Sequence, residues 1–567
     1  MGAERNASAS TGFYSRYLLF IAGIGGLLYG ADIGIIAAAL LYVGKTIELT
    51  LQQTSLIVAA VLGGSMLGSL ASGVLADWFG RRKMMIVSGL MFVASVGVIV
   101  FSRDFTTLFA GRLLQGISGG VIAVVVPLYL AECLSANSRG RGTAIFQFFL
   151  TFGIVAAALI GYLYTRQAET AVAMAHGNAD LIRAAQNHAW RGMFLAVIYP
   201  GLIFFGGSFM LSETPRWLVR KGKTDEALKA LRRSVPEDEA QREMAEMQQL
   251  AHESRSNSAS SESLFRRKYV VPFVLACIVL SLTQTTGINS VLSYLVVILR
   301  QAGMSASHAT QGDVLVKLVN CATTLLAVFL VDRKGRRFLL RIGTAGIIVA
   351  LGIGGTIFLR SEATRIDVKS KIETSATNNQ IHLPLDQASL GNAVSGRVMA
   401  LTVAYSYGHG EHLATVLSDT DQPSLDVAPE PNEISSPLVI DRAFYGPVPT
   451  EKTGWLVAAC LALFIMSYAI GPGVVVWLTL SELMPTRIRS TGMGIALLLN
   501  QGISTAIAGV FLPVVGNHGY SAMFFFWAGC TVLYYLTATF LLPETRGKSL
   551  EEIEMHFEGK REAPATS

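Results

Sequence analysis

Twelve apolar segments, each long enough to cross a lipid bilayer as a helix, make up most of this 567-residue chain. A membrane-spanning helix needs about 20 predominantly apolar residues. Only 15% of the residues are charged, whereas soluble domains carry about 25%. The segments are 17–41, 54–77, 84–102, 106–131, 142–164, 191–212, 270–299, 309–331, 338–360, 452–481, 490–513 and 519–542. We therefore predict an all-α membrane protein with twelve transmembrane helices.

Lysine and arginine in the short loops predict the orientation of the chain. They cluster in every second loop, around Arg81, Arg139, Arg216, Arg336 and Arg489. Because loops of this kind stay in the cytoplasm, we expect a multi-pass protein of the cell membrane with both termini cytoplasmic. These loops also explain the net charge of +6, so we expect no nucleic-acid partner.

Polar stretches divide the chain into parts. We expect a cytoplasmic tail (1–16), a six-helix half (17–212), a cytoplasmic linker with helical periodicity (213–269), a second six-helix half (270–542) and a cytoplasmic tail (543–567). An extracytoplasmic insertion, 361–451, interrupts the second half. It is polar and poor in aromatic residues, and partial disorder is the default expectation for such a composition.

Metal and disulfide chemistry find little support in the sequence. The five cysteines are scattered without paired spacing, at Cys133, Cys277, Cys321, Cys460 and Cys530, and this pattern suggests no disulfide framework. His409, Glu411 and His412 place three potential ligands within four loop residues, but so short a motif is weak evidence. We expect no metal site and no cofactor.

The chain repeats itself. Asp77-Trp-Phe-Gly-Arg-Arg after the second segment recurs as Asp332-Arg-Lys-Gly-Arg-Arg after the eighth. Glu132, followed seven residues later by Arg139, recurs as Glu482 and Arg489. Two six-helix halves with the same topology are a transporter architecture whose site lies between the halves.

An aspartate, Asp32, lies well inside the first apolar segment, and an ionisable residue there indicates a functional site. At 1.5 Å per residue, Asp32 and Arg112 fall at similar depths in the first and fourth helices. Pairing offsets the cost of burying each charge. Protonation of Asp32 would free Arg112 and change which conformation is favoured, which makes the pair a candidate proton switch. A static ion pair that only joins two helices is the alternative.

Amide and aromatic side chains inside apolar helices are suited to hold a ligand rich in hydroxyl groups. Asn and Gln both donate and accept hydrogen bonds, as sugar hydroxyls do, and an indole face packs on the C–H face of a pyranose. The candidates are Tyr29, Gln147, Gln284, Asn289, Asn320, Trp477 and Asn500. Each amide could instead join helices. Gly471-Pro472-Gly473, just before Trp477, predicts a kink in the tenth helix.

The charges at the cytoplasmic helix ends form a second constellation. Its members are Asp77, Arg81, Glu132, Arg139 and Arg216 in the first half and Asp332, Arg336, Glu482 and Arg489 in the second. A solvated basic face would explain the arginines but not the repeated acidic residues. We interpret the set as a latch between the halves, closed when the site faces outward. Because single exposed pairs contribute at most about 1 kcal/mol, only a network could bias the conformation.

The chain resembles the sugar porter family of the major facilitator superfamily, both its proton symporters and its facilitators. The resemblance rests on several motifs in order: Gly73-x-x-x-Asp77-x-x-Gly80-Arg81-Arg82, Gly111-Arg112-x-x-Gln115-Gly116, Pro127-Leu-Tyr129-Leu-Ala-Glu132, Glu213-Thr-Pro215-Arg216-Trp217-Leu218, Gly287-Ile288-Asn289 and Pro543-Glu544-Thr545. It implies that Asp32 and Arg112 couple protons, that the amides and Trp477 bind sugar, and that the cytoplasmic charges form the gate. Thr283 and Gln501 depart from residues that are frequent in the family, and Ile154 resembles the facilitative glucose transporters instead of a bacterial proton symporter that has glutamine there, so the particular sugar stays open.

These observations predict a secondary transporter, not an enzyme, that moves a monosaccharide or a cyclic polyol with a proton by alternating access. We expect it to work as a monomer in the lipid bilayer. Two alternatives remain: a facilitative uniporter in which Asp32 is structural, and a sugar sensor that does not transport.

Overall fold

A computed structural model describes residues 2–134, 136–235, 237–256, 267–377, 379–384, 398–408, 410–418, 424–429, 436–484 and 489–544. Its first half is a set of helices: α1 (Gly2–Thr46), α2 (Leu51–Phe79), α3 (Arg81–Phe101), α4 (Phe105–Cys133), α5 (Ala136–Met174), α6 (Ala179–Ala196) and α7 (Ile198–Ser208). Three shorter helices follow: α8 (Pro215–Arg220), α9 (Thr224–Ser234) and α10 (Glu237–Ser256).

The second half repeats this arrangement with more interruptions. It contains α11 (Arg267–Thr285), α12 (Ile288–Gln301), α13 (Ala306–Lys334), α14 (Arg336–Glu362), α17 (Glu451–Ile470), α18 (Pro472–Leu483), α19 (Arg489–Leu536) and the short π-helix η1 (Thr537–Leu541). Ten of the described helical segments are long and apolar enough to cross a membrane. The last of these segments covers two predicted spans. The 29-residue helix α13 covers another predicted span, 309–331, so the helices agree with the twelve predicted transmembrane helices.

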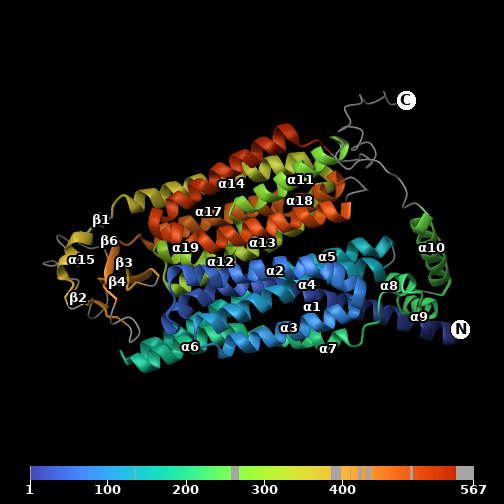
Figure 1. Ribbon diagram of the computed structural model, residues 1–567, viewed down its shortest axis with the longest axis horizontal. Helices are drawn as coiled ribbons and strands as arrows, with labels where there is room; N and C mark the ends of the chain where they lie inside the picture. Colours follow the sequence, from blue (N-terminus) through green and yellow to red (C-terminus); the bar gives the residue numbers. More distant parts are fainter. Residues whose placement is uncertain are drawn as a thin grey trace.

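The two halves lie side by side along the length of the bundle (Figure 1). They meet where α2 packs against α19, α5 against α13 and α1 against α12. The N-terminal end of α1 and the helices α8 to α10 lie at one end of the bundle, which we call the termini end. The strands lie at the opposite end, which we call the β-domain end.

Close backbone contacts fix the position of α1. A Cβ atom on Gly30 would lie 1.9 Å from the carbonyl oxygen of Leu150 on α5. On the neighbouring pair, a Cβ atom on Gly116 of α4 would lie 2.2 Å from the carbonyl oxygen of Val61 on α2. Because only glycine permits this approach, both contacts require a glycine at these positions.

Three breaks interrupt helices of the second half. Gly287, with φ of +85°, separates α11 from α12 within what the sequence presents as one span. Gly471 separates α17 from α18 directly before Pro472, which confirms the predicted kink. Gly519, with φ of +83°, breaks the helical geometry within α19. The first two breaks interrupt single predicted spans, as in transporters with broken helices, whereas Gly519 lies between two predicted spans, beside Glu362 at the end of α14.

The insertion between α14 and α17 contains a folded β domain, so the expected partial disorder is wrong for its described residues. Its elements are β1 (Ile366–Asp367), α15 (Lys369–Ser375), β2 (Ile381–Pro384), β3 (Met399–Ser406), β4 (His412–Leu417), β5 (Ser424–Val427) and β6 (Val439–Pro447). The strands form a sheet of order β1-β6-β3-β4 and a pair β2-β5, all antiparallel. Buried residues such as Leu401, Val403 and Ile440 give the domain its own core. Alternation along β3 and β6 supplies those residues, although the overall composition is polar.

Candidate functional site

Asp32 and Arg112 form a buried ion pair in the first half. The nitrogen Nη1 of Arg112 lies 3.0 Å from Oδ1 of Asp32, and each side chain is 1% exposed. The same nitrogen donates to Oε1 of Gln115 at 2.7 Å, and the guanidinium lies 5.3 Å from the centre of the Phe194 ring. The structure therefore brings together the two residues that depth alone predicted to meet.

The other carboxylate oxygen of Asp32, Oδ2, has no hydrogen-bond partner among the described residues. It lies beside Gly119, where a Cβ atom would be 3.5 Å away. The ring of Tyr29 borders the same glycine, with Cδ2 at 3.3 Å from that Cβ position. A buried carboxylate oxygen without a donor is costly to keep charged, and it is an open position for a proton.

Three of the predicted amides form one cluster in the second half. Gln284 donates from Nε2 to Oδ1 of Asn500 at 3.2 Å and accepts at Oε1 from Nδ2 of Asn289 at 3.0 Å. Asn289 also donates to the hydroxyl of Ser504 at 2.7 Å. The break at Gly287 creates this cluster, because it turns the end of α11 and the start of α12 toward the same part of α19. We call Gln284, Asn289, Asn500 and Ser504 the amide cluster.

The other predicted site residues are not joined to this cluster by the described contacts. Gln147 and Asn320 are half-buried on α5 and α13, two helices that pack across the halves. Trp477, on α18, is 50% exposed. The sequence patterns do not point to Trp527, a buried indole that packs on Gly287 and supports the turn before Asn289. A Cβ atom on Gly287 would lie 2.3 Å from the indole ring.

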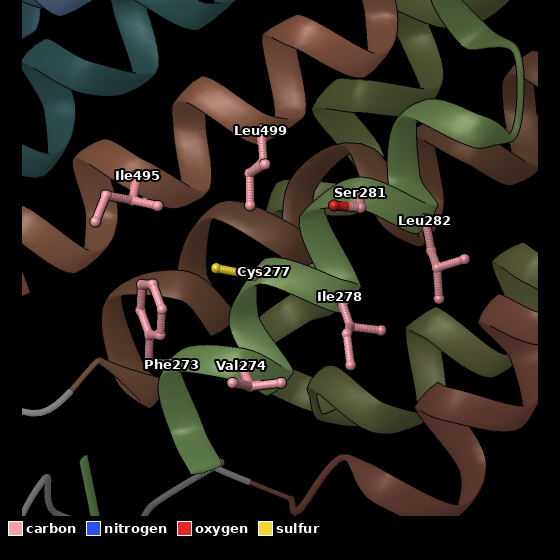
Figure 2. Close-up of a pocket in the computed structure, with 8 residues that line it drawn as sticks. All are labelled: Phe273, Val274, Cys277, Ile278, Ser281, Leu282, Ile495 and Leu499. Atoms are coloured by element: carbon pink, nitrogen blue, oxygen red, sulfur yellow. The ribbon is translucent and has the colours of Figure 1, made fainter. Parts of the chain in front are cut away.

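A pocket of about 520 Å³ lies between α11 and α19, and Figure 2 shows the side chains that line it. Its lining includes Ser281, one helical turn before Gln284 on α11, and Leu499, the neighbour of Asn500 on α19. Most of its other side chains are apolar, among them Val274 and Ile278. Such a lining offers few partners to sugar hydroxyls, in contrast to the side chains of the amide cluster.

At the termini end of the first half, Arg81 joins two acidic residues. Its side chain lies 2.9 Å from Asp77 and 2.9 Å from Glu132. Glu132 also accepts from the hydroxyl of Thr214 at 2.6 Å. The Glu213 carboxylate accepts from the backbone N–H groups of Arg81 and Arg82 at 2.9 and 3.1 Å, which caps the start of α3. From α8, Arg220 pairs with Asp77 at 3.3 Å, whereas the predicted partner Arg216 is exposed.

The second half repeats this network. Arg336 lies 3.0 Å from Glu482, and Glu544 accepts from the backbone N–H groups of Arg336 and Arg337 at 3.1 and 3.2 Å. Each of these ion pairs stays within its own half. Arg81 and Arg336 thus each tie helix ends of one half together, and the latch between the halves stays a prediction. The side chains of Arg139, Asp332 and Arg489 lie outside the described residues.

No group of three potential metal ligands lies together in the described part of the chain. In the β domain, the Glu411 carboxylate pairs with Arg442, which occupies one of the three ligands considered from the sequence. Another of them, His409, lies outside the described residues.

The model of the family described as sugar (and other) transporter matches residues 18–377 and 442–557. The match covers most of the chain, and the chain therefore belongs to this family of sugar transporters, the sugar porters of the major facilitator superfamily. It is a multi-pass membrane protein. The internal stretch without a match, 378–441, belongs to the insertion between α14 and α17.

Known relatives cover nearly the whole chain. The glucose transporter GlcP of Staphylococcus epidermidis is 27% identical over 543 residues, which are 95% of this chain and 97% of that protein. Probable inositol transporter 2 of Arabidopsis thaliana is 28% identical over 565 residues, 96% and 92% of the two chains. The human proton myo-inositol cotransporter is 26% identical over 550 residues, 95% and 81%.

Solved structures show the same fold. The inward-open conformation of the xylose transporter XylE from E. coli matches with a TM-score of 0.66 at 20% identity, covering 95% of this chain and 98% of that one. A XylE structure bound to 6-bromo-6-deoxy-D-glucose matches with a TM-score of 0.63, also at 20% identity, covering 96% and 100%.

Proposed function

We propose that this chain carries a monosaccharide or a cyclic polyol into the cell together with a proton. The observation that carries the proposal is the ion pair of Asp32 and Arg112, which is closed off from solvent and leaves one carboxylate oxygen without a donor. A proton on that oxygen neutralises Asp32 and weakens its hold on Arg112. The energy of the proton gradient can then shift the balance between two arrangements of the halves.

The amide cluster supports a polyhydroxylated substrate. Gln284, Asn289 and Asn500 now satisfy one another, and a sugar entering between them would exchange amide–amide for amide–hydroxyl hydrogen bonds. Such an exchange keeps each polar group paired, which limits the cost of binding. The names of the glucose and inositol relatives support this substrate class.

The proposed activity is transport and not catalysis. The described polar clusters contain amides and paired charges, and the sequence offers neither a nucleophile with its base nor a phosphate-binding glycine loop. Under this proposal the site among the helices α1, α4, α11 and α19 opens first to one side of the membrane and then to the other. The cargo crosses without a chemical change.

A facilitator is the second candidate. Gln115 and Phe194 also hold Arg112, and an arginine fixed on three sides could serve only to join α1 and α4. Uptake by proteoliposomes separates the two functions. We expect uptake of one or more members of a panel of hexoses, pentoses and inositols to rise when the outside is made acidic, and a rate independent of the pH gradient would favour the facilitator.

A further inference from the structure

A second buried ion pair lies on α13, and the mechanism above does not use it. Lys317 and Asp313 are one helical turn apart, and Nζ of Lys317 lies 2.8 Å from Oδ2 of Asp313. The lysine is 0% exposed and the aspartate 1%. Burying two charges inside a bundle costs several kcal/mol, so the pair calls for an explanation beyond the folding of one helix.

The ammonium of Lys317 also reaches into the other half of the protein. It donates a hydrogen bond to the backbone carbonyl oxygen of Gly34 on α1 at 3.0 Å. Gly34 follows Asp32 by two residues, in the same turn of the helix. The turn is held firmly, since a Cβ atom on Gly34 would lie 2.8 Å from the backbone oxygen of Ile154 on α5.

The other described hydrogen bonds between the halves do not involve an ionised side chain as donor. Gln311, two residues before Asp313 on α13, donates to the hydroxyl of Tyr162 on α5 at 3.0 Å. Leu512 donates from its backbone to the hydroxyl of Ser55 at 3.2 Å. Hydrogen bonds with an ionised donor or acceptor are roughly twice as strong as neutral ones. Among the described hydrogen bonds between the halves, Lys317 shares this advantage with the Glu169 carboxylate, which accepts from the backbone N–H of Ser307 at 3.0 Å.

We propose that Lys317 is a positioning residue that fastens the second half to the helix of Asp32 and is released when the halves separate at the β-domain end. Asp313 keeps the ammonium charged while it is buried, and Gly34 is the docking point. Because the docking point and the coupling aspartate share one helical turn, a movement of that turn is passed directly to α13. The link to Asp32 rests on the proposed function, whereas the fastening of the halves by Lys317 and Gly34 does not.

The fastening can be tested without any assumption about protons. Glu48 and Lys452 are both exposed. Glu48 lies three residues before Leu51, which donates to the backbone of Glu411 in the β domain, and Lys452 lies at the start of α17, soon after β6. Spin labels at these two positions report the separation of the halves in a background with the five cysteines replaced by serine. The variant Lys317→Met with Asp313→Leu removes both charges together and so leaves no unpaired buried charge. We expect it to raise the ratio of separated to closed molecules about tenfold, which corresponds to about 1.4 kcal/mol.

Matched variants separate a specific role from a general loss of packing. Gln311→Leu removes a neutral contact on the same helix and is expected to change the ratio less than threefold. Lys317→Arg, with Asp313 unchanged, keeps a charged donor, and most molecules of this variant are expected to stay closed. An unchanged distance distribution in the double variant, or an equal shift in Gln311→Leu, would overturn the proposal.

A measurement on the unaltered chain covers the case in which the double variant does not fold. Amine-reactive labelling followed by mass spectrometry should modify Lys317 only under conditions in which the spin labels report separation. Labelling of Lys317 in the closed population would overturn the proposal. Failure of proton coupling in the transport assay would leave both results unaffected, so the two proposals fail separately.

Discussion

The two halves of this transporter share a framework but differ in what they hold at mid-bundle. At the termini end each half ties an arginine to a glutamate and caps a helix with a second glutamate. At mid-bundle the first half holds the buried pair of Asp32 and Arg112, whereas the second holds the amide cluster. The repeat thus supplies the same arginine–glutamate frame to both halves. The proposed proton and sugar chemistry, in contrast, is divided between them.

The largest expected effect tests this division from the proton side. Asp32→Asn removes the negative charge but keeps the shape, so the proton gradient no longer acts on the pair with Arg112. We expect accumulation of sugar in proteoliposomes to fall to the equilibrium ratio, while exchange of labelled sugar continues. Gln115→Glu, which adds a carboxylate beside Arg112, serves as a contrasting variant. Normal accumulation by Asp32→Asn would refute the proton role.

A second prediction concerns the shared frame. Arg81 and Glu132 are 2% and 4% exposed, whereas Arg336 and Glu482 are 13% and 22% exposed. Breaking a buried pair costs about 3–5 kcal/mol, and a more exposed pair about 1 kcal/mol. We expect Glu132→Ala to lower the apparent free energy of unfolding in detergent much more than Glu482→Ala. Equal losses would show that the two frames are equally buried in solution.

The sugar side of the comparison is tested by Gln284→Ala. Gln284 joins Asn289 to Asn500, so its loss removes the centre of the amide cluster. We expect sugar affinity, measured by calorimetry, to weaken at least tenfold, or about 1.4 kcal/mol. Thr283→Val is the matched control, because the Thr283 hydroxyl points to Tyr534. If affinity is unchanged in Gln284→Ala, the cluster is only structural.

The smallest expected effect sharpens the comparison at the termini end. Burial raises the pKa of the Glu213 carboxyl above its ordinary value, and the backbone N–H groups of Thr214, Arg82 and Arg81 oppose this shift. The folded state therefore binds the proton more tightly than the unfolded chain, and stability falls as the pH rises from the ordinary carboxyl pKa through the raised one. Glu213→Gln should flatten this slope in thermal unfolding at a series of pH values. Glu226→Gln, at an exposed carboxylate, should leave the slope as it is.

Much of the fold followed from local patterns in the sequence. Apolar length predicted the helices, and the repeated Asp-x-x-Gly-Arg-Arg motif predicted two halves. The depth of Asp32 and Arg112 could be estimated because the rise of a helix per residue is constant. The kink at Gly471 could be predicted because proline acts on its own helix.

Other features depend on which helices become neighbours, and a linear pattern does not contain that information. Three features depend on packing in this way: the ion pairs within each half, the β domain folded from a polar insertion, and the contact of Trp527 with Gly287. Lys317 falls inside the predicted span 309–331, and only packing brings its ammonium to the carbonyl oxygen of Gly34.

The sequence by itself thus determined the membrane-spanning helices, their twofold repeat and the candidate residues of the site. Beyond the pair of Asp32 and Arg112, the tertiary structure decided which of those residues meet. The physical reason is that helix formation is governed by neighbours along the chain, whereas hydrogen bonds and ion pairs form between side chains far apart in sequence, at distances of a few ångströms that only packing sets.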